Sequence, residues 1–268
     1  MKLTDFYRLM APLYDADYAG ILEDGIGFYV DLARESGGPV LEMGCGTGRI
    51  LLPTARAGIP ITGMEISPDM LDVLRRAAAS EPDEVRQRVA LVEGDMRSDG
   101  APGRFSLVTA PFRVAAHLLE RADQRAWLRN VKRHLLPGGL LCFDVFQFNP
   151  QYLVQENKPP VVIDRTEPET GCRIRRFDSL HSLTALQVLE VHMEWVKENA
   201  VGERVWSQNA DCQLRWFTRA ELESLLELEG FEVVDYWGSF ARQPFGVGSE
   251  QQIIRARATV TSVPQGHW

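Results

Sequence analysis

The sequence predicts an α/β fold built on a parallel, doubly wound sheet, and three observations carry this prediction. Short apolar runs alternate with segments of helical periodicity between residues 21 and 146, which is typical of βαβ units. A glycine-rich turn at residues 44–48 joins the first apolar run to the helical segment after it. From residue 161 the apolar residues alternate with period two, which indicates an antiparallel β insertion before the final helix.

The predicted elements of the first half follow in order along the chain. Residues 1–20 are irregular and too short to form a core. Ser67, Pro68 and Asp69 predict a helix start, because serine caps a helix, proline suits its first position and aspartate meets the positive end of its dipole. Helices are expected over residues 21–36, 49–57, from 67 onward and over 123–136; strands are expected from residue 40 and over 59–66, 88–92, 105–110 and 140–146.

Residues 161–217 carry the antiparallel pattern. Apolar residues at 189, 191, 193 and 195 alternate with polar ones, and residues 197–204 form a polar, glycine-containing turn between two such runs. Trp195 is expected to pack inside this insertion, since large aromatic side chains are mostly buried. Arg173, Arg175 and Arg176 are expected on a solvated edge or face of the same sheet.

Helical order returns at Thr218, whose partner Glu221 predicts a capping box, and ends at Gly230. Residues 231–236 and 252–258 are the last two predicted strands. The chain therefore divides into a core of residues 1–150 and 218–260 and an antiparallel insertion of residues 151–217. We expect the insertion to form either a substrate lid or a dimer surface, so a homodimer stays open.

Composition and charge oppose several classes of function. The formal net charge of −8 argues against a nucleic-acid partner, which needs clustered Lys and Arg. The chain start does not resemble a signal peptide, and no run approaches the roughly 18 apolar residues of a membrane span. We therefore expect a cytoplasmic protein with no membrane partner. The cysteines form no C-x-x-C pair, so neither a metal site nor a disulfide framework is expected; they are Cys45, Cys142, Cys172 and Cys212.

The glycine-rich turn is the most informative segment. Gly44, Gly46 and Gly48 alternate with other residues, which lets the backbone adopt positive φ and lets a ligand lie directly against it. The spacing is G-x-G-x-G, not the G-x-G-x-x-G of a dinucleotide site, and Glu42 stands two residues before the first glycine. A carboxylate in that place suits a cationic ligand better than a pyrophosphate.

Residues 41–48 resemble motif I of the class I S-adenosylmethionine-dependent methyltransferases, and four later segments fit the same family. Glu65 ends the second strand, where the family's carboxylate binds the ribose hydroxyls. Residues 94–96 end the third strand, with a carboxylate for the adenine amino group, and the fourth strand ends within residues 109–113, where the family's strand lies over the sulfonium. Residues 135–139 match the turn before the fifth strand.

This resemblance implies a Rossmann-like doubly wound sheet of seven strands whose last strand is antiparallel. It implies S-adenosyl-L-methionine as cofactor and S-adenosyl-L-homocysteine as product. The segments 14–18 and 214–218 are similar to those of bacterial small-molecule members, including N,N-dimethyltransferases of nucleotide-linked amino sugars. The cofactor-binding residues that the resemblance implies are Tyr14, Tyr18, Glu42, Gly44, Cys45, Gly46, Gly48, Glu65, Ile66, Met70, Gly94, Asp95, Met96, Ala110, Pro111 and Phe112.

The function implied is methyl transfer to a nitrogen or oxygen of a small-molecule acceptor. Because the sulfonium is already activated, such an enzyme mainly aligns the reactants and excludes water. Arg113 and His117 are the expected catalytic residues, with His117 a base, a substrate contact or a structural histidine. Arg113 and Arg215 would favour an anionic acceptor if both faced the pocket. The expected substrate-binding residues are Tyr7, Gln147, Phe148, His192, Arg215, Trp216 and Tyr236.

Two other functions stay open. A nucleic-acid or protein methyltransferase shares the core, but the acidic balance and the lack of an Asn/Asp-Pro-Pro-Tyr type motif at residues 109–112 oppose the nucleic-acid form. A non-catalytic module that only binds S-adenosylmethionine would carry the same cofactor residues. Measurable turnover of the cofactor would exclude it.

Overall fold

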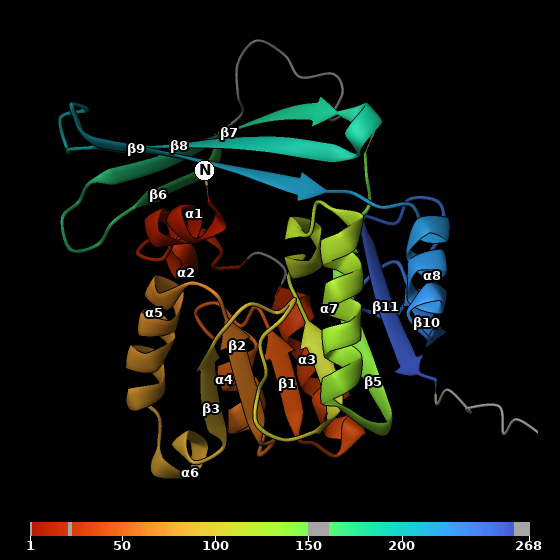
Figure 1. The fold of residues 1–268 in the computed structure, drawn as a ribbon. Helices are drawn as coiled ribbons and strands as arrows, with labels where there is room; N and C mark the ends of the chain where they lie inside the picture. The colour runs from red at the N-terminus through yellow and green to blue at the C-terminus, as the bar shows by residue number, and fades with distance from the viewer. Residues whose placement is uncertain (1, 21–22, 150–160, 260–268) are drawn as a thin grey trace, which may run out of the picture.

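The computed structural model describes residues 2–20, 23–149 and 161–259, and its centre is a seven-stranded mixed sheet (Figure 1). The strands are β1 (Val40–Met43), β2 (Ile61–Glu65), β3 (Val89–Glu93), β4 (Phe105–Ala110), β5 (Leu135–Phe146), β10 (Phe231–Trp237) and β11 (Gln251–Ala258). Their order is β10-β11-β5-β4-β1-β2-β3, and β11 runs antiparallel to both of its neighbours. The predicted fold, including the antiparallel last strand, is confirmed.

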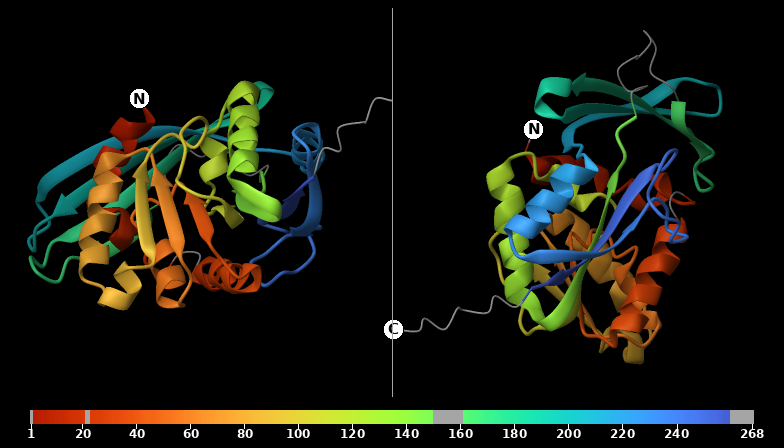
Figure 2. Two further views of the ribbon diagram at one scale, coloured as in Figure 1. Left: turned by 60° about the horizontal axis from the view of Figure 1, so that its bottom comes forward. Right: turned by 90° about the vertical axis from the view of Figure 1, so that its right-hand side faces the viewer.

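Helices cover both faces of this sheet (Figure 2). One face packs on α3 (Glu23–Ser36), α4 (Leu51–Arg56), α5 (Pro68–Ala79) and α6 (Asp83–Arg86), and the other on α7 (Arg121–His134) and α8 (Arg219–Leu228). The strands are apolar on both sides, with Leu41 and Val108 facing α7 and α8 while Val40 and Leu107 face the opposite layer. Within the described ranges, no helix has the length and apolarity needed to cross a membrane.

The boundary between α7 and β5 differs from the sequence prediction. The helix ends at His134 and the strand begins at Leu135, whereas the prediction carried the helix to residue 136 and started the strand at 140. Leu135 has ψ 141°, an extended conformation. Pro137 cannot continue a helix and disfavours helical geometry in the residue before it, so the chain extends earlier than the apolar pattern suggested.

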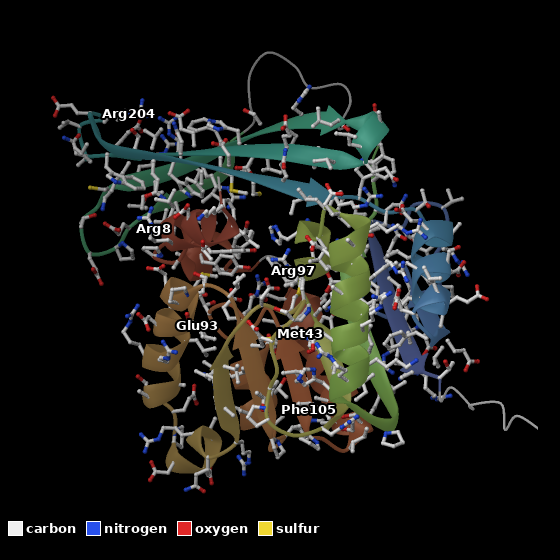
Figure 3. All side chains as sticks on the ribbon, viewed as in Figure 1. Arg8, Met43, Glu93, Arg97, Phe105 and Arg204 are labelled. Carbon is white, nitrogen blue, oxygen red and sulfur yellow. The ribbon has the colours of Figure 1, made fainter. Side chains whose placement is uncertain are left out.

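A four-stranded antiparallel sheet forms the insertion. Its strands are β6 (Val161–Thr166), β7 (Arg173–Leu183), β8 (Val188–Glu198) and β9 (Arg204–Arg215), with a 3-10 turn η3 (Thr184–Leu186) between β7 and β8. Figure 3 shows Met43 and Glu93, the last residues of β1 and β3, nearer to this sheet than Phe105, the first residue of β4. The insertion therefore lies over the carboxyl ends of the core strands.

The N-terminal segment is helical and contributes to a core, so the prediction of an irregular segment without a core is wrong. Its helices are α1 (Leu3–Met10) and α2 (Tyr14–Asp17). Phe6 and Met10 are buried in one cluster with Val191 and Trp195 of the insertion. A short segment acquires a core because strands almost two hundred residues later in the chain supply its apolar partners.

A buried ionic cluster also joins the N-terminal segment to the insertion, and it corrects the prediction for Arg176. This side chain is only 3% exposed, and its Nε donates to Asp178 Oδ1 at 2.9 Å. Its Nη1 lies 3.7 Å from Asp17 Oδ2, which also accepts a hydrogen bond from Trp195 Nε1 at 2.6 Å. Arg173, on the opposite face of β7, is exposed as predicted, and Trp195 packs inside the insertion as predicted.

We predict that Asp17→Ala lowers the free energy of unfolding by about 3 kcal/mol, because it leaves the buried Trp195 Nε1 without an acceptor and removes one of the two carboxylates that neutralise the buried Arg176. The matched control is Asp31→Ala, whose ion pair with Arg34 is exposed on both sides and should contribute less than about 1 kcal/mol. Urea unfolding measures both. Equal losses in the two variants would contradict the structural role of the cluster.

Candidate functional site

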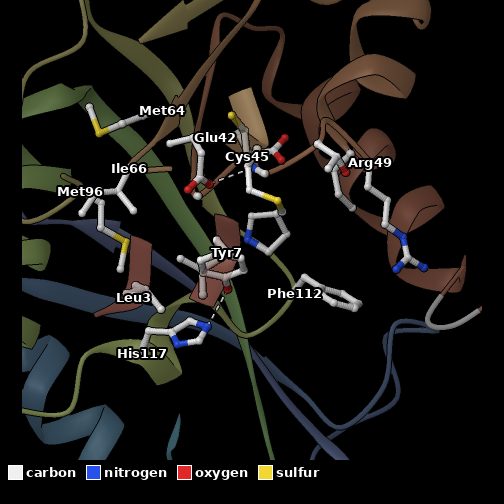
Figure 4. A pocket seen from close by; sticks show the side chains of 18 of the residues that line it. Leu3, Tyr7, Glu42, Cys45, Arg49, Met64, Ile66, Met96, Phe112 and His117 are labelled. Carbon is white, nitrogen blue, oxygen red and sulfur yellow. Dashed lines mark hydrogen bonds between the residues drawn. The ribbon is translucent and has the colours of Figure 1, made fainter. Parts of the chain in front are cut away.

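The site lies where the direction of strand order reverses. β1 pairs with β2 on one side and with β4 on the other, and ligands of open α/β sheets bind at such a switch point, beyond the carboxyl ends of the strands. A pocket opens there, bounded by the loops after β1, β2, β3 and β4 and by α1 and α2 (Figure 4). Of the predicted cofactor-binding residues, those lining it are Tyr14, Glu42, Gly44, Cys45, Gly46, Glu65, Ile66, Met70, Gly94, Asp95, Met96, Pro111 and Phe112.

The glycine-rich turn after β1 needs its glycines for two different reasons. Gly44 has φ +74°, and a Cβ there would lie 2.7 Å from Val114, so only glycine lets the loop after β4 approach this closely. Gly48 has φ +90°, and a Cβ there would lie 2.3 Å from Leu74 in α5. Gly48 does not line the pocket, so its part is to let α5 pack against the turn.

Glu65 joins the first two loops of the pocket. Its Oε2 accepts a hydrogen bond from the Gly46 backbone N–H at 2.9 Å, and its Oε1 accepts one from Ser67 N–H at 3.0 Å. Burial raises the pKa of this carboxyl, while the backbone donors act in the opposite direction. A carboxylate can accept about four hydrogen bonds, so both oxygens keep capacity for a ligand.

Glu42 is a buried carboxyl without a full set of partners. It is 1% exposed and lines the pocket, and its Oε2 has no hydrogen-bond partner among the described residues. Burial, followed by the nearby charge of Glu65, raises its pKa well above the ordinary value. Burying such an oxygen unpaired is costly, so the position favours a ligand that brings a donor or a positive charge.

Arg49 is a pocket residue that the sequence analysis did not select. Its guanidinium lies over the Phe112 ring, 4.9 Å from the centroid, and its buried Nη1 has no hydrogen-bond partner in the described part of the chain (Figure 4). Burial lowers the pKa of Arg49, and the largest effect in the opposite direction comes from Tyr14. The sequence feature that could have identified Arg49 is its position directly after the glycine-rich turn, from which its side chain reaches the same pocket.

Asp95 lines the far end of the pocket with a fixed carboxylate. Arg97 Nη2 donates to Asp95 Oδ2 at 2.6 Å, and Arg97 Nη1 donates to Asp123 at 2.8 Å. The hydrogen bonds from Arg97 hold the pKa of Asp95 below its ordinary value, so this group is negative at neutral pH. The cation is itself shared between two carboxylates and carries little excess positive charge into the pocket.

Asp144 is the most important residue that the sequence analysis missed. It is fully buried, and its carboxylate accepts hydrogen bonds from Tyr29 Oη at 2.6 Å and from the backbone N–H groups of Phe112 and Arg113 at 2.8 and 3.0 Å. Phe112 and Arg113 have φ of 60° and 64°, a left-handed conformation that side chains disfavour. The only signal was one carboxylate inside the apolar run of β5.

His117 and Tyr7 meet at the insertion side of the pocket. His117 ends the 3-10 helix η1 (Val114–His117), Tyr7 lies on α1, and Tyr7 Oη is 2.8 Å from His117 Nε2 (Figure 4). Burial lowers the pKa of His117 to about 4 and raises that of Tyr7 well above its ordinary value. Both groups are therefore uncharged at neutral pH.

The remaining predicted site residues lie outside this pocket, and their roles stay predictions. Tyr18 packs edge-on against Phe112 and beneath Arg176, and Ala110 is buried inside β4. Arg113 lies over the Phe146 ring.

Several predicted substrate contacts gather elsewhere. Phe148 directly follows Gln147 before the insertion, and Trp216 directly follows β9, the last strand of the insertion. Their rings stack with centroids 4.3 Å apart. Arg215 donates to Glu221 at 2.6 Å, and Tyr236 is hydrogen-bonded to Gln252.

Comparison with known proteins agrees with this geometry. The family described as "Methyltransferase domain" matches residues 40–139. The dTDP-3-amino-3,6-dideoxy-alpha-D-glucopyranose N,N-dimethyltransferase of Streptomyces fradiae is 34% identical over 195 residues, covering 70% of this chain and 71% of that protein. The cypemycin N-terminal methyltransferase of a Streptomyces species is 26% identical over 229 residues, covering 81% and 82%.

Solved structures share the whole architecture. The CcbJ methyltransferase of Streptomyces caelestis superposes with a TM-score of 0.75 at 26% identity, covering 94% of this chain and 96% of that one. The S-adenosylmethionine-bound CalS10 of Micromonospora echinaspora, an amino pentose methyltransferase, gives a TM-score of 0.68 at 24% identity, covering 92% and 97%. Both superpositions cover almost the whole of each chain, so they include the inserted sheet.

We predict that His117→Gln changes how stability depends on pH. Folded His117 stays neutral down to a pKa of about 4, whereas the unfolded chain binds a proton near pH 6.5. The folded state thus holds fewer protons between these values, so the histidine's contribution to stability is complete above pH 6.5 and is lost as pH falls towards 4.

Urea unfolding at pH 7, 5.5 and 4.5 tests this. The free energy of the wild type should fall relative to that of His117→Gln by up to about 1.4 kcal/mol per pH unit. The exposed His181→Gln is the matched control and should run parallel to the wild type. A pH-independent difference between wild type and His117→Gln would contradict the buried, neutral state.

Proposed function

The chain belongs to the class I S-adenosylmethionine-dependent methyltransferases that act on small molecules, and on this premise we propose that it methylates a nitrogen atom of its acceptor. Both curated relatives described above are named for N-methylation. Methylation of oxygen usually requires a base, and His117, with a pKa of about 4, is a weak one at neutral pH. An amine needs only to arrive unprotonated.

The observation that carries the cofactor assignment is a pair of buried polar atoms without hydrogen-bond partners among the described residues, one on an acidic and one on a basic side chain of the pocket. Glu42 offers a buried oxygen without a partner, and Arg49 offers a buried N–H without a partner, both among the described residues. S-adenosylmethionine carries a sulfonium, an ammonium and a carboxylate, so it can complement both signs of charge. The residues present therefore fit this group.

We assign the remaining contacts from the same geometry. Glu65 would hold the ribose hydroxyls with its spare acceptor capacity, and Asp95 would accept from the adenine amino group. Ile66, Met70 and Met96 supply apolar surface around the base. Gly44, Cys45 and Gly46 of the glycine-rich turn line the same pocket.

When bound, the cofactor supplies an activated methyl group on a positively charged sulfur. The chain's own residues then orient the acceptor and exclude water. Leu3, Tyr7 and Tyr14 close the insertion side of the pocket. We infer that Tyr7 and His117 position the acceptor through hydrogen bonds, because two neutral groups that already pair with each other are poor proton acceptors.

We further propose that the insertion is a substrate lid. The N-terminal helices lie between the insertion and the pocket, and the buried cluster of Asp17 and Arg176 fixes them to the inner face of the insertion sheet. The acidic net charge of −8 supports a small-molecule acceptor over a nucleic acid.

We predict that S-adenosylhomocysteine binds the purified protein in calorimetric titration, and that Glu42→Gln and Arg49→Gln each weaken binding at least tenfold, which is about 1.4 kcal/mol. Glu42→Gln removes the acidic group that a cationic part of the ligand would contact, and Arg49→Gln removes the positive charge that the ligand's carboxylate would contact. Arg34→Gln, on the exposed end of α3, is the control and should bind as the wild type does. A folded wild type that does not bind, or a Glu42→Gln variant that binds equally well, would overturn the assignment.

A further inference from the structure

A second pocket opens beside the cofactor pocket and shares Leu3 and His117 with it. It lies between α1, the chain after η1 and the middle of strands β7, β8 and β9. We call it the insertion groove. Its inner wall is formed by Leu3, His117, Phe6, Leu119, Leu180, Val191 and Cys212, and its border also includes the strand residues Ser179, His181, Glu190, His192, Asp211 and Gln213. Figure 4 shows Leu3 and His117 close together at one side of the cofactor pocket, where the two spaces meet.

Glu190 and Asp211 border the groove, but their side chains lie on the other face of the sheet from Leu180, Val191 and Cys212. Leu180, Val191 and Cys212 are directly paired across β7, β8 and β9, so their side chains share one face of the sheet. Neighbouring residues of a strand point to opposite faces, which directs Glu190, His192 and Asp211 outward. Their side chains are 43%, 47% and 63% exposed, and His192 pairs there with Asp211. The predicted substrate contact His192 thus lies on the outer face.

The titratable side chains on the inner wall of the groove are uncharged, and the charged residues at its border, Glu190 and Asp211, are acidic. Burial lowers the pKa of His117 to about 4 and raises that of Cys212 to about 12, so neither is charged near pH 7. Among the described residues that line the groove, none is Lys or Arg.

The arginines that could have served an anionic acceptor are engaged elsewhere. Arg215 pairs with Glu221, and Arg113 lies over Phe146; neither lines the groove or the cofactor pocket. Arg97 lines the cofactor pocket but is bound by Asp95 and Asp123. A phosphate placed in the groove would find no cationic partner among the described residues and would lie beside the carboxylates of Glu190 and Asp211, which is unfavourable.

We propose that the insertion groove holds the body of the methyl acceptor, and that this acceptor is a phosphate-free amine with a predominantly apolar, uncharged body. The inference rests on the proposed N-methyltransferase function and narrows its substrate class. It separates this chain from the Streptomyces fradiae relative, whose named substrate carries a dTDP group. An apolar groove also favours the neutral form of a bound amine, because burial disfavours the ammonium form, and the neutral form is the one that can react.

A matched pair of acceptors tests the proposal. The octyl glycoside of 3-amino-3,6-dideoxyglucose and the dTDP-linked form of the same sugar present the same amine on a neutral and on a doubly anionic body. Calorimetry on protein saturated with S-adenosylhomocysteine, and transfer of labelled methyl from S-adenosylmethionine, should both favour the octyl glycoside at least tenfold. Preference for the dTDP sugar would overturn the proposal, and so would binding of neither by protein that binds S-adenosylhomocysteine.

Charge placed in the groove provides the second test. Leu180→Glu should weaken binding of the octyl glycoside at least tenfold and leave the affinity for S-adenosylhomocysteine unchanged. Leu186→Glu, which makes the same change at an exposed leucine that lines neither pocket, is the matched control and should have no effect. If Leu180→Glu does not fold, Cys212→Phe fills the groove without charge and should give the same loss.

Equal binding by the folded groove variant and the wild type would place the acceptor elsewhere and overturn the proposal. Failure of the wild type to bind S-adenosylhomocysteine would instead overturn the proposed function, so the two outcomes are distinguishable.

Discussion

The buried carboxylate of Asp144 is the constraint on which the rest of the site depends. It lies on β5, yet its three hydrogen-bond donors come from α3 and from the loop after β4. Those bonds hold Phe112 and Arg113 in the left-handed region, and the chain then turns directly into η1. Val114 thereby reaches Gly44, and His117 reaches Tyr7. One side chain thus sets the distance between the two loops that face each other across the switch point.

A second constraint acts from the opposite side of the pocket. The core supplies the loops proposed to bind the cofactor, but the wall proposed to face the acceptor comes from α1 and from the insertion. These two segments are held together by apolar packing and by the Asp17 cluster, in which Asp17 accepts a hydrogen bond from Trp195 and lies beside Arg176. On the proposed function, cofactor binding and acceptor recognition are therefore carried by separate parts of the fold that meet at Leu3 and His117.

The parts predicted well from sequence are those whose cause is local. The glycine-rich turn, the Ser67 cap and Glu65 follow from neighbouring residues and strand ends, and the structure places each as expected. Asp144 and Arg176 were not foreseen, because their donors and acceptors lie far away in sequence. The alternation of apolar and polar residues correctly predicted that Trp195 is buried inside the insertion. The same alternation places His192 on the outer face of the insertion sheet. The face of the insertion sheet that borders the site is determined by how the insertion packs on α1 and the core. No local sequence pattern encodes that packing.

The partnership between α2 and the insertion has a consequence for biosynthesis. Asp17 and the indole that donates to it are separated by 178 positions along the chain. At ribosomal speeds of about 5–20 residues per second, the N-terminal helices wait roughly 10–40 s after emerging before their partner strands exist. During that interval Phe6 and Met10 lack the surface that buries them in the finished protein. The parallel strands and their loops can begin to form first, so the wall built from α1 and the insertion assembles after the glycine-rich turn and the loops that follow it.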